Sequence, residues 1–318
     1  MDQIKVARSF IASDALAELI EREYDLGTVT CKMFSKMVRT QDNDHYQVKT
    51  ADGTKYVARI YQFGEPMERA ESDYLFEMDW LNFLKANDMP VSYPIARDDG
   101  GYLGSVNAPE GKRYYALFSF ASGEALSLTD EEQLYRCGAE MARIHMVSNQ
   151  YQSQYDRAIM DLENLVDKPV ARIMSLWDES RADDLDIVLT AAAEAKEEIL
   201  ALLRNEESSE DSWGPIGGDF HNASVRFDKN GNPTFFNFDL CGYGWRSYDI
   251  ATFLLNTGLM HKSTDLSEAF FAGYYSVREL SRNEHEAISP FLTIRRVWMT
   301  GSFTMDQGMV GHTFIASI

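Results

Sequence analysis

The strongest constraint on the fold is a β-hairpin signal near residue 50. Tyr46–Lys49 alternates apolar and polar side chains, as a strand with one buried face does. Asp52-Gly53 follows, and this dipeptide favours the tight turn of a hairpin. Tyr56–Tyr61 then has the apolar and aromatic composition of a returning strand. The first third of the chain is therefore predicted to contain an antiparallel sheet.

Helical patterns stand on both sides of this hairpin. Before it, four apolar residues are spaced as one helical face and predict a helical lead-in: Val6, Phe10, Leu16 and Leu19. After it, an apolar stripe beside Glu77 predicts a helix over residues 68–86. Further strands are expected at Tyr102-Leu103 and Tyr114–Phe118, around a turn at Pro109–Gly111.

The sequence after Gly123 is mainly helical in pattern. Thr129 and Glu132 have the spacing of a capping box, which predicts a helix start at Thr129. Residues 186–203 are rich in strong helix formers and predict another helix. A second capping-box spacing, Asp265 with Glu268, predicts a helix through Tyr274, and residues 235–238 predict a short buried strand.

The order of these elements predicts an α+β chain with two lobes. Residues 1–120 are expected to form a small β-rich lobe with the helical lead-in and one long helix. Residues 121–318 are expected to form a larger, mainly helical lobe. A sheet-rich half followed by a helical half is the order of a protein-kinase-like fold.

Composition narrows the functional classes. The net charge of −20 disfavours binding to nucleic acid and to anionic membranes. No apolar run approaches the ~20 residues that cross a bilayer, and no signal peptide is expected. The three cysteines are far apart and lack metal-ligand spacing, so a reduced, cytoplasmic protein is expected.

Three neighbouring segments resemble the aminoglycoside phosphotransferase and choline kinase family, of which homoserine kinase type II is a relative. Residues 218–225 read GDFHNASV and resemble the catalytic loop H-G-D-x-H-x-x-N. Residues 236–244 read FNFDLCGYG and are similar to the metal-binding segment I-D-F-D-x-x-G-x-G. Residues 245–251 look like the segment that closes this region, and Gly138–His145 looks like a family helix that ends in A-x-x-H.

The resemblance implies a site that transfers phosphate from ATP. Asp219 would be the base that accepts the hydroxyl proton of the acceptor, with His221 bracing the loop. Arg59 and Glu77 occupy the positions of a phosphate-binding cation and the carboxylate that orients it. The main chain near Ser119 and Phe120 resembles the hinge that meets adenine. Phosphoryl transfer needs in-line positioning and neutralised phosphate charge, which these residue types supply.

Three residues depart from the family pattern at its most diagnostic positions. Gly217 replaces a His, Ser224 replaces a metal-binding Asn, and Asn237 replaces a metal-binding Asp. Mg²⁺ is usually held by one or two carboxylates together with phosphate oxygens. Ser224, Asn237 and Asp239 are therefore the candidate ligands of an altered magnesium site.

Two functional hypotheses remain open at this point. In the first, the chain is an ATP-dependent kinase that phosphorylates a hydroxyl of a small, amine-bearing metabolite. Five residues are candidate liners of the acceptor pocket: Trp245, Tyr248, Arg295, Arg296 and Trp298. In the second, the chain has lost phosphotransfer and keeps the fold for binding or regulation. The identity of the acceptor, the choice of ATP or GTP and the oligomeric state do not follow from the sequence.

Overall fold

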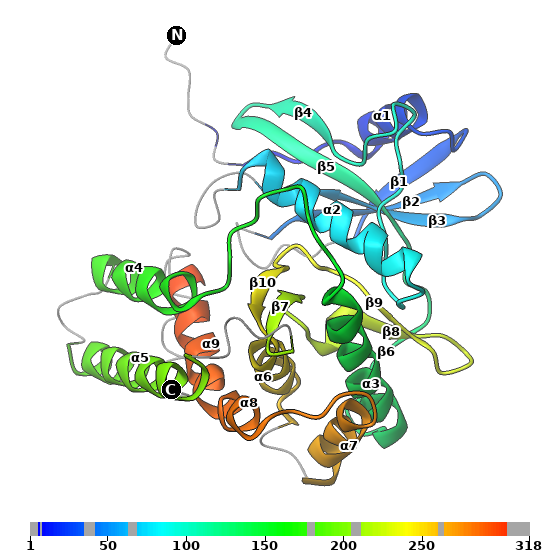
Figure 1. Ribbon diagram of the computed structural model, residues 1–318. Helices are drawn as coiled ribbons and strands as arrows, with labels where there is room; N and C mark the ends of the chain where they lie inside the picture. The colour runs from blue at the N-terminus through cyan, green and yellow to red at the C-terminus, as the bar shows by residue number, and fades with distance from the viewer. Residues whose placement is uncertain are drawn as a thin grey trace.

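The computed structural model describes Val6 and residues 8–34, 42–62, 69–176, 182–204, 211–259 and 264–303. Its first part is a five-stranded antiparallel sheet in the order β1-β2-β3-β5-β4 (Figure 1). The strands are β1 Val29–Met33, β2 Asp44–Thr50, β3 Lys55–Ile60, β4 Gly104–Ala108 and β5 Gly111–Ser119.

The predicted hairpin is confirmed as β2 and β3. The two strands pair in antiparallel register from Asp44↔Ile60 to Lys49↔Lys55. The turn contains Gly53 at φ 91°, a conformation that glycine adopts without steric cost. The second predicted hairpin is also present, as β4 and β5, although Tyr102-Leu103 lies just before β4.

The helical lead-in is shorter than predicted. Helix α1 spans Ser13–Glu23, and its Leu16 and Ile20 are fully buried against the sheet. Val6 and Phe10 precede the helix and are 37% and 49% exposed, so the prediction of one continuous helical face was wrong. The spacing of these two residues matched a helix only by coincidence.

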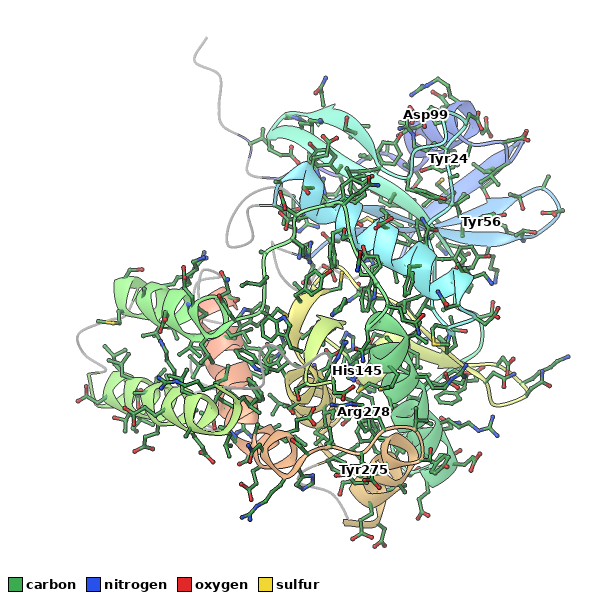
Figure 2. The ribbon with its side chains drawn as sticks, viewed as in Figure 1. Tyr24, Tyr56, Asp99, His145, Tyr275 and Arg278 are labelled. Atoms are coloured by element: carbon green, nitrogen blue, oxygen red, sulfur yellow. The ribbon has the colours of Figure 1, made fainter. Side chains whose placement is uncertain are left out.

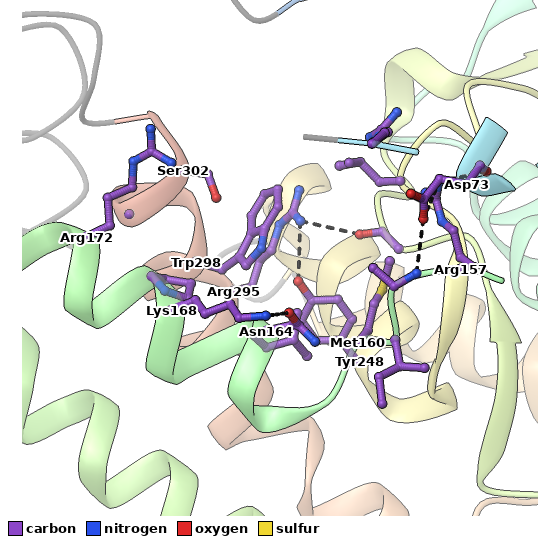
Figure 3. A pocket seen from close by; sticks show the side chains of 18 of the residues that line it. Asp73, Arg157, Met160, Asn164, Lys168, Arg172, Tyr248, Arg295, Trp298 and Ser302 are labelled. Atoms are coloured by element: carbon purple, nitrogen blue, oxygen red, sulfur yellow. Dashed lines mark hydrogen bonds and ion pairs between the residues drawn. The ribbon is translucent and has the colours of Figure 1, made fainter. Parts of the chain in front are cut away.

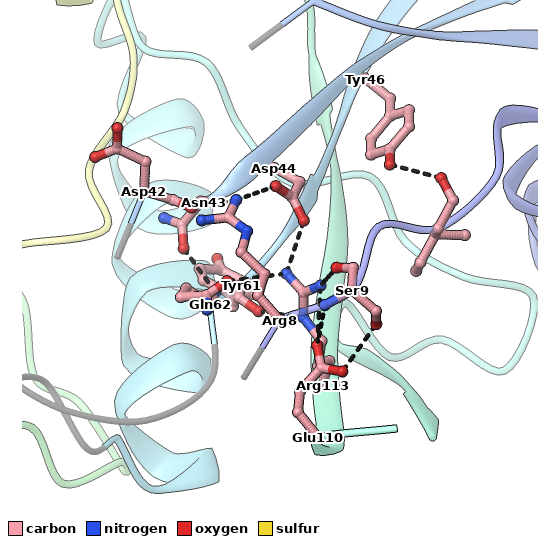
Figure 4. Close-up of polar contacts among 11 residues, drawn as sticks. Arg8, Ser9, Asp42, Asn43, Asp44, Tyr46, Tyr61, Gln62, Glu110 and Arg113 are labelled. Atoms are coloured by element: carbon pink, nitrogen blue, oxygen red, sulfur yellow. Dashed lines mark hydrogen bonds and ion pairs between the residues drawn. The ribbon is translucent and has the colours of Figure 1, made fainter. Parts of the chain in front are cut away.

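A polar network ties the start of the chain to the sheet (Figure 4). The buried carboxylate of Asp44 on β2 accepts hydrogen bonds from Arg8 and from Nη2 of Arg113 on β5, the latter at 2.9 Å. Nη1 of Arg113 also donates to the carbonyl of Ser9, at 2.8 Å. Because a charge removed from water is costly unless it is paired, this network fixes the segment before α1.

Helix α2 spans Glu71–Ala86 and lies between the sheet and the helical part of the chain (Figure 1). Its buried side includes Phe76, Trp80 and the carboxylate of Glu77. Tyr114 of β5 and Tyr61, which follows β3, both pack on Tyr74 of this helix. The sheet is thereby held against one face of α2.

The second part of the described chain is mainly helical. Its helices are α3 Glu131–Ser148, η1 Glu163–Asp167, α4 Lys168–Leu176, α5 Ala182–Leu203, α6 Arg246–Thr257, α7 Thr264–Tyr275, α8 Arg282–Glu286 and α9 Ile288–Phe303. Short strands lie among them: β6 Glu124–Ala125, β7 Trp213–Ile216, β8 Val225–Phe227, β9 Pro233–Phe235 and β10 Gly242–Trp245. Its large apolar core extends from α2 to α9.

Some predicted element ends shift by a few residues. The N-cap of α3 is Asp130, whose carboxylate accepts a hydrogen bond from the N–H of Gln133, so the capping box at Thr129 was wrong by one position. Asp265 lies inside α7 instead of capping it. The predicted strand at 235–238 ends at Phe235, because Asn237 has φ 68° and cannot continue a strand.

None of the helices in the described ranges is long and apolar enough to cross a membrane.

Candidate functional site

The loop that carries Asp219 follows β7, and its main chain is hydrogen-bonded to a buried carboxylate. The N–H groups of Gly217 and Gly218 donate to Oδ2 and Oδ1 of Asp249, at 2.8 and 2.7 Å. Asp249 lies on α6 and is fully buried. Gly218 has φ 75°, so the chain turns here in a conformation that other residues rarely adopt.

A chain of buried polar side chains supports Asp249 in turn. His145 at the end of α3 contacts Oδ2 of Asp249 at 3.2 Å through Nε2, and the Tyr274 hydroxyl at 2.9 Å through Nδ1. Arg278 donates to that hydroxyl at 3.0 Å, so the hydroxyl proton is directed toward His145. Figure 2 labels His145 and Arg278 in the helical part of the chain. This arrangement places the His145 proton on Nε2, where it donates to Asp249.

Burial controls the protonation of this chain. It lowers the pKa of His145 well below the usual value, and the charges of Arg246 and Arg278 act in the same direction. Burial raises the pKa of Asp249 to about 7, against the two N–H bonds that stabilise its charged form. Sequence reasoning did not assign a role to either residue, although both lie in segments that resembled the family.

Asp219 is oriented by two side chains from distant helices. Its Oδ1 accepts hydrogen bonds from Nη2 of Arg295 on α9 and, at 3.2 Å, from Nδ2 of Asn256 on α6. Its Oδ2 lies 4.0 Å from Nε2 of His221. These contacts leave Oδ2 as the carboxylate oxygen that can accept a further proton.

His221 forms a main-chain hydrogen bond within the loop. Its Nδ1 accepts from the N–H of Ala223 at 3.1 Å and caps the short helix η3 Asn222–Ser224. The proton of the neutral ring therefore lies on Nε2, the atom that faces Asp219. Burial lowers the pKa of His221, partly offset by the carboxylate of Asp219.

Packing against the Phe220 ring explains why residue 217 is a glycine. A Cβ atom there would lie 2.7 Å from the ring of Phe220. That ring cannot move away easily, because it packs edge-on against Phe235 and Phe238 at centroid distances of 5.5 and 5.6 Å. The Phe220–Phe238 contact also joins the residue after Asp219 to the residue after Asn237, so the two segments pack side by side.

Arg59 and Glu77 form a buried ion pair. Nη1 of Arg59 donates to Oε1 of Glu77 at 2.6 Å, and the Tyr61 hydroxyl donates to the other carboxylate oxygen at 2.8 Å. The guanidinium also lies 4.7 Å from the centroid of the Phe118 ring, a cation–π contact. Burial opposes the charge, but Glu77, Tyr61 and Asp239 together more than compensate and raise the pKa of Arg59.

Asn237, which was predicted as a metal ligand, faces this ion pair. Nη2 of Arg59 donates to Oδ1 of Asn237 at 3.4 Å. Asn237 has φ 68°, a conformation in which asparagine is found more often than most other residues. The sheet and the 236–239 segment therefore meet through a guanidinium and a neutral amide.

Asp239 and Ser224, the other two candidate metal ligands, are also hydrogen-bonded within the protein. Oδ2 of Asp239 accepts from Nδ2 of Asn43 at 2.8 Å and lies 4.0 Å from Arg69. Burial raises its pKa, but Arg59, Arg69, His45 and Arg157 together bring the pKa below the usual value. The Ser224 hydroxyl accepts from the N–H of His221 at 3.0 Å and donates to the carbonyl of His221 at 2.8 Å.

This donor set does not fit Mg²⁺. Within the described ranges, no three His, Cys, Asp or Glu side chains are grouped so that they could hold a metal ion. The oxygens of Ser224 and Asn237 are neutral, and those of Asn237 and Asp239 face guanidinium or amide donors. A divalent cation beside Arg59 and Arg69 would meet repulsion that a carboxylate pair normally offsets.

The two predicted hinge residues, Ser119 and Phe120, differ in their contacts within the protein. The N–H of Ser119 donates to the carbonyl of Tyr93 at 2.9 Å, and its own carbonyl accepts from the Ser92 hydroxyl at 2.6 Å. Both main-chain groups of Ser119 are thus used within the protein. Phe120 follows β5, is partly buried and carries Lys55 over its ring at 5.4 Å.

A cavity of about 790 Å³ opens beside Gly218, between α4 and α9 (Figure 3). Three of the predicted acceptor-pocket residues line it: Tyr248, Arg295 and Trp298. Arg295 is 3% exposed and lies over the Trp298 ring at 4.5 Å. Arg296 is not among the lining residues. Trp245 is not one either, since it is 2% exposed and packs edge-on against Trp213 in the core.

Comparison with known proteins supports the resemblance seen in the sequence. A family model described as "Phosphotransferase enzyme family" matches residues 38–287. Among relatives, an uncharacterised protein of Synechocystis is 28% identical over 292 residues, covering 91% of this chain and 77% of the relative. A homoserine kinase of Burkholderia mallei is 27% identical over 139 residues, covering 44% of this chain and 38% of the kinase.

Solved structures share the fold over nearly the whole chain. An amicoumacin kinase in complex with AMP-PNP, Ca²⁺ and Ami has a TM-score of 0.74 at 20% identity, covering 96% of this chain and 91% of that one. A microcompartment-associated aminopropanol kinase gives 0.74 at 20% identity, covering 96% and 92%. Choline kinase from Cryptosporidium parvum gives 0.66 at 13% identity, covering 96% and 94%. The predicted two-lobed kinase-like fold is confirmed.

Proposed function

Because this chain belongs to the phosphotransferase enzyme family, we propose that it transfers the γ-phosphoryl group of ATP to a hydroxyl of a small molecule. The observation that carries this proposal is the geometry at Asp219. Its Oδ1 is fixed by Arg295 and Asn256, while Oδ2 lies 4.0 Å from Nε2 of His221 and accepts no hydrogen bond from the described side chains. A carboxylate held this way beside a cavity of about 790 Å³ suits a base that meets a bound hydroxyl.

The transfer step follows from these positions. The acceptor hydroxyl lies in the cavity, and its oxygen attacks the γ-phosphorus. The bond from that phosphorus to the bridging oxygen breaks, ADP leaves, and the hydroxyl proton passes to Oδ2 of Asp219. His221 holds the loop in shape through Ala223, and Asp249 holds it through the two glycine N–H groups. Most of the catalysis in such a reaction comes from positioning and charge neutralisation.

Arg59 is proposed to bind the phosphates of ATP. Its charge is secured by Glu77, and a planar guanidinium can hold two phosphate oxygens at once. We also propose that the nucleotide lies between residues 1–120 and 121–318, with adenine near the main chain of Phe120. No step is assigned to a metal ion, because the oxygen donors at 224, 237 and 239 do not suit one.

A second function is favoured by the same substitutions. Neutral oxygens at 224 and 237, with Asp239 paired to Asn43, would also suit a protein that binds a nucleotide without transferring phosphate. Both functions use the same binding site. Only the first includes transfer of phosphate to an acceptor.

The acceptor predicted from the resemblance was an amine-bearing metabolite. The aminopropanol kinase and choline kinase among the similar structures act on amines by their names, which agrees with that prediction. The basic residues around the cavity favour an acceptor with an anionic group instead.

The test is release of ADP from ATP by the purified protein in the presence of pooled hydroxyl compounds. Transfer is expected with at least one pool and should be lost in Asp219→Asn, while ATP binding measured by calorimetry stays unchanged. ATP binding without turnover in any pool would favour the binding function. Absence of ATP binding would contradict both.

A further inference from the structure

The cavity beside Asp219 has the opposite charge to the protein as a whole. The chain carries 50 acidic and 30 basic residues, so an average stretch of surface is acidic. Among the described residues, the charged side chains that line the cavity are five basic and one acidic: Arg69, Arg157, Lys168, Arg172, Arg295 and Asp73. Four of the basic residues also lie within 4.0 Å of a carboxylate: Arg69, Arg157, Lys168 and Arg295. Clefts lined by one sign of charge concentrate ligands of the other sign.

Arg157 is a buried cation of this lining whose hydrogen bonds go mainly to main-chain carbonyls. Arg157 is only 6% exposed and donates to three main-chain carbonyls, those of Cys241, Asp73 and Asp239. The carboxylate of Asp73 lies 4.0 Å away. Neutral carbonyls satisfy the N–H groups but leave the positive charge in place, where burial makes its field stronger.

The opposite wall carries two basic residues on one helix, of which Lys168 lies 3.4 Å from Glu163 and donates to Oδ1 of Asn164 at 2.7 Å. Lys168 and Arg172 are one turn apart on α4 and lie with Ser302 and Trp298 of α9 at the other end of the cavity from Asp73 and Arg157 (Figure 3). Helix α4 is fixed against α9 by close contact, since a Cβ on Gly301 would lie 2.7 Å from Pro169. The spacing of this wall from Asp219 is therefore set by packing.

We propose that the acceptor is a small alcohol that carries an anionic group, a phosphate or a carboxylate. The anionic group binds between Lys168 and Arg172, with the Ser302 hydroxyl within the same end of the cavity. The acceptor hydroxyl then points toward Oδ2 of Asp219. Anion binding stands on the cavity alone, whereas the role of that hydroxyl rests on the proposed phosphotransfer.

The binding test uses inorganic phosphate as the probe, with ethanolamine as the cationic probe at matched ionic strength. Phosphate should stabilise the protein against thermal unfolding, and ethanolamine should not. The variant Lys168→Glu should weaken phosphate binding by about tenfold, the loss of one charge-assisted hydrogen bond. Lys168 is 63% exposed and lies 3.4 Å from Glu163, so this variant keeps the fold.

The matched control is Lys112→Glu on β5. Lys112 is 50% exposed and lies 3.4 Å from Glu71, so it changes the net charge equally at a similar surface ion pair outside the cavity. Phosphate binding should be unchanged in this control, and ATP binding should be unchanged in both variants. Equal weakening in the two variants would overturn the proposed location.

The turnover test compares acceptors that share a hydroxyl and differ in charge. Glycerol 3-phosphate, 3-phosphoglycerate and glycerate are the anionic set, and choline, ethanolamine and 1-amino-2-propanol are the cationic set. Transfer to the anionic set, reduced in Lys168→Glu, supports the proposal. Transfer to the cationic set alone overturns it while leaving phosphotransfer intact. If no acceptor reacts, phosphate binding lost in Lys168→Glu still supports an anion site, and the function in phosphotransfer fails separately.

Discussion

The two ends of the cleft differ in what their charged groups can still do. At the transfer end, Asp219 is fixed through one oxygen by Arg295 and Asn256, and its second oxygen faces His221 at 4.0 Å. At the phosphate end, Asn237 and Asp239 face Arg59 and Asn43. The transfer end keeps an acid–base group, and the phosphate end has guanidinium groups where a metal ion would need carboxylates. A neutral amide at position 237 therefore does not exclude the role of base proposed for Asp219.

The largest effect is expected from Asp219→Asn at the transfer end. The amide cannot accept the hydroxyl proton, so kcat should fall about a thousandfold. The ATP dissociation constant should stay unchanged, because Asp219 is not among the groups proposed to bind phosphate. The exposed Asp156 provides the control variant Asp156→Asn, which should keep full activity. Steady-state kinetics with calorimetry would show whether the two ends act separately, and comparable turnover in both variants would remove Asp219 as the base.

A smaller effect is expected from Arg59→Lys at the phosphate end. Lysine keeps the charge but loses the planar fork that can hold two oxygens and contact Glu77, so the ATP dissociation constant should rise about tenfold. Arg136→Lys on α3 makes the same change at a surface ion pair with Glu132 and serves as the control. Calorimetry that finds equal ATP affinity in wild type and Arg59→Lys would rule out the phosphate clamp.

The positive field of the phosphate end should also appear in the pH dependence of stability. Burial and the charge of Arg59 lower the pKa of His45 to about 4, from a usual value near 6.5. Between those values the unfolded chain binds a proton that the folded chain does not, so stability is lost as the pH falls from about 6.5 to about 4. The replacement His45→Gln should reduce the loss of unfolding free energy between pH 7 and 4.5 by about 2 kcal/mol.

Urea unfolding at the two pH values measures this difference. The control is His285→Gln, at an exposed position on α8, which should leave the pH dependence close to that of wild type. A wild-type pH dependence in His45→Gln would show that burial and Arg59 do not lower the pKa of His45 in the folded protein.

The smallest effect is expected from Asn237→Asp, which adds a carboxylate at the phosphate end. The new carboxylate would lie beside Arg59 and Asp239 and restore one ligand for a divalent cation. Addition of Mg²⁺ should then strengthen ATP binding by a few-fold more than it does in wild type. Asn230→Asp in an exposed turn is the control. An identical response to Mg²⁺ in all three proteins would contradict this account of position 237.

Sequence reasoning found the elements whose determinants are local. Asp52-Gly53 fixed the β2–β3 hairpin, because a turn of this kind depends on two residues. The ion pair of Arg59 with Glu77 was predicted from the resemblance, and the structure brings the two side chains within 2.6 Å. The capping box at Thr129 was wrong because Asp130, the next residue, is a better hydrogen-bond acceptor for the same helix end.

Features that depend on distant packing were missed. Arg295 was predicted to line the acceptor pocket, but its bond to Asp219 spans 76 positions and has no spacing signal. Trp245 was predicted as a pocket residue from its place in a motif, yet its indole is enclosed by Trp213 and Phe291. The basic character of the cavity could not be predicted from the sequence either, because its basic residues come from α4, α9 and segments far apart in the sequence.

We propose that guanidinium groups, chiefly Arg59, take the place of a metal ion at the phosphate end. Titration of ATP into the wild-type protein by calorimetry, once with Mg²⁺ and once with EDTA, tests this most directly. The predicted result is binding in both conditions, with dissociation constants within about threefold of each other, less than 1 kcal/mol. Binding that disappears in EDTA would contradict the claim and return the phosphate end to an ordinary magnesium site.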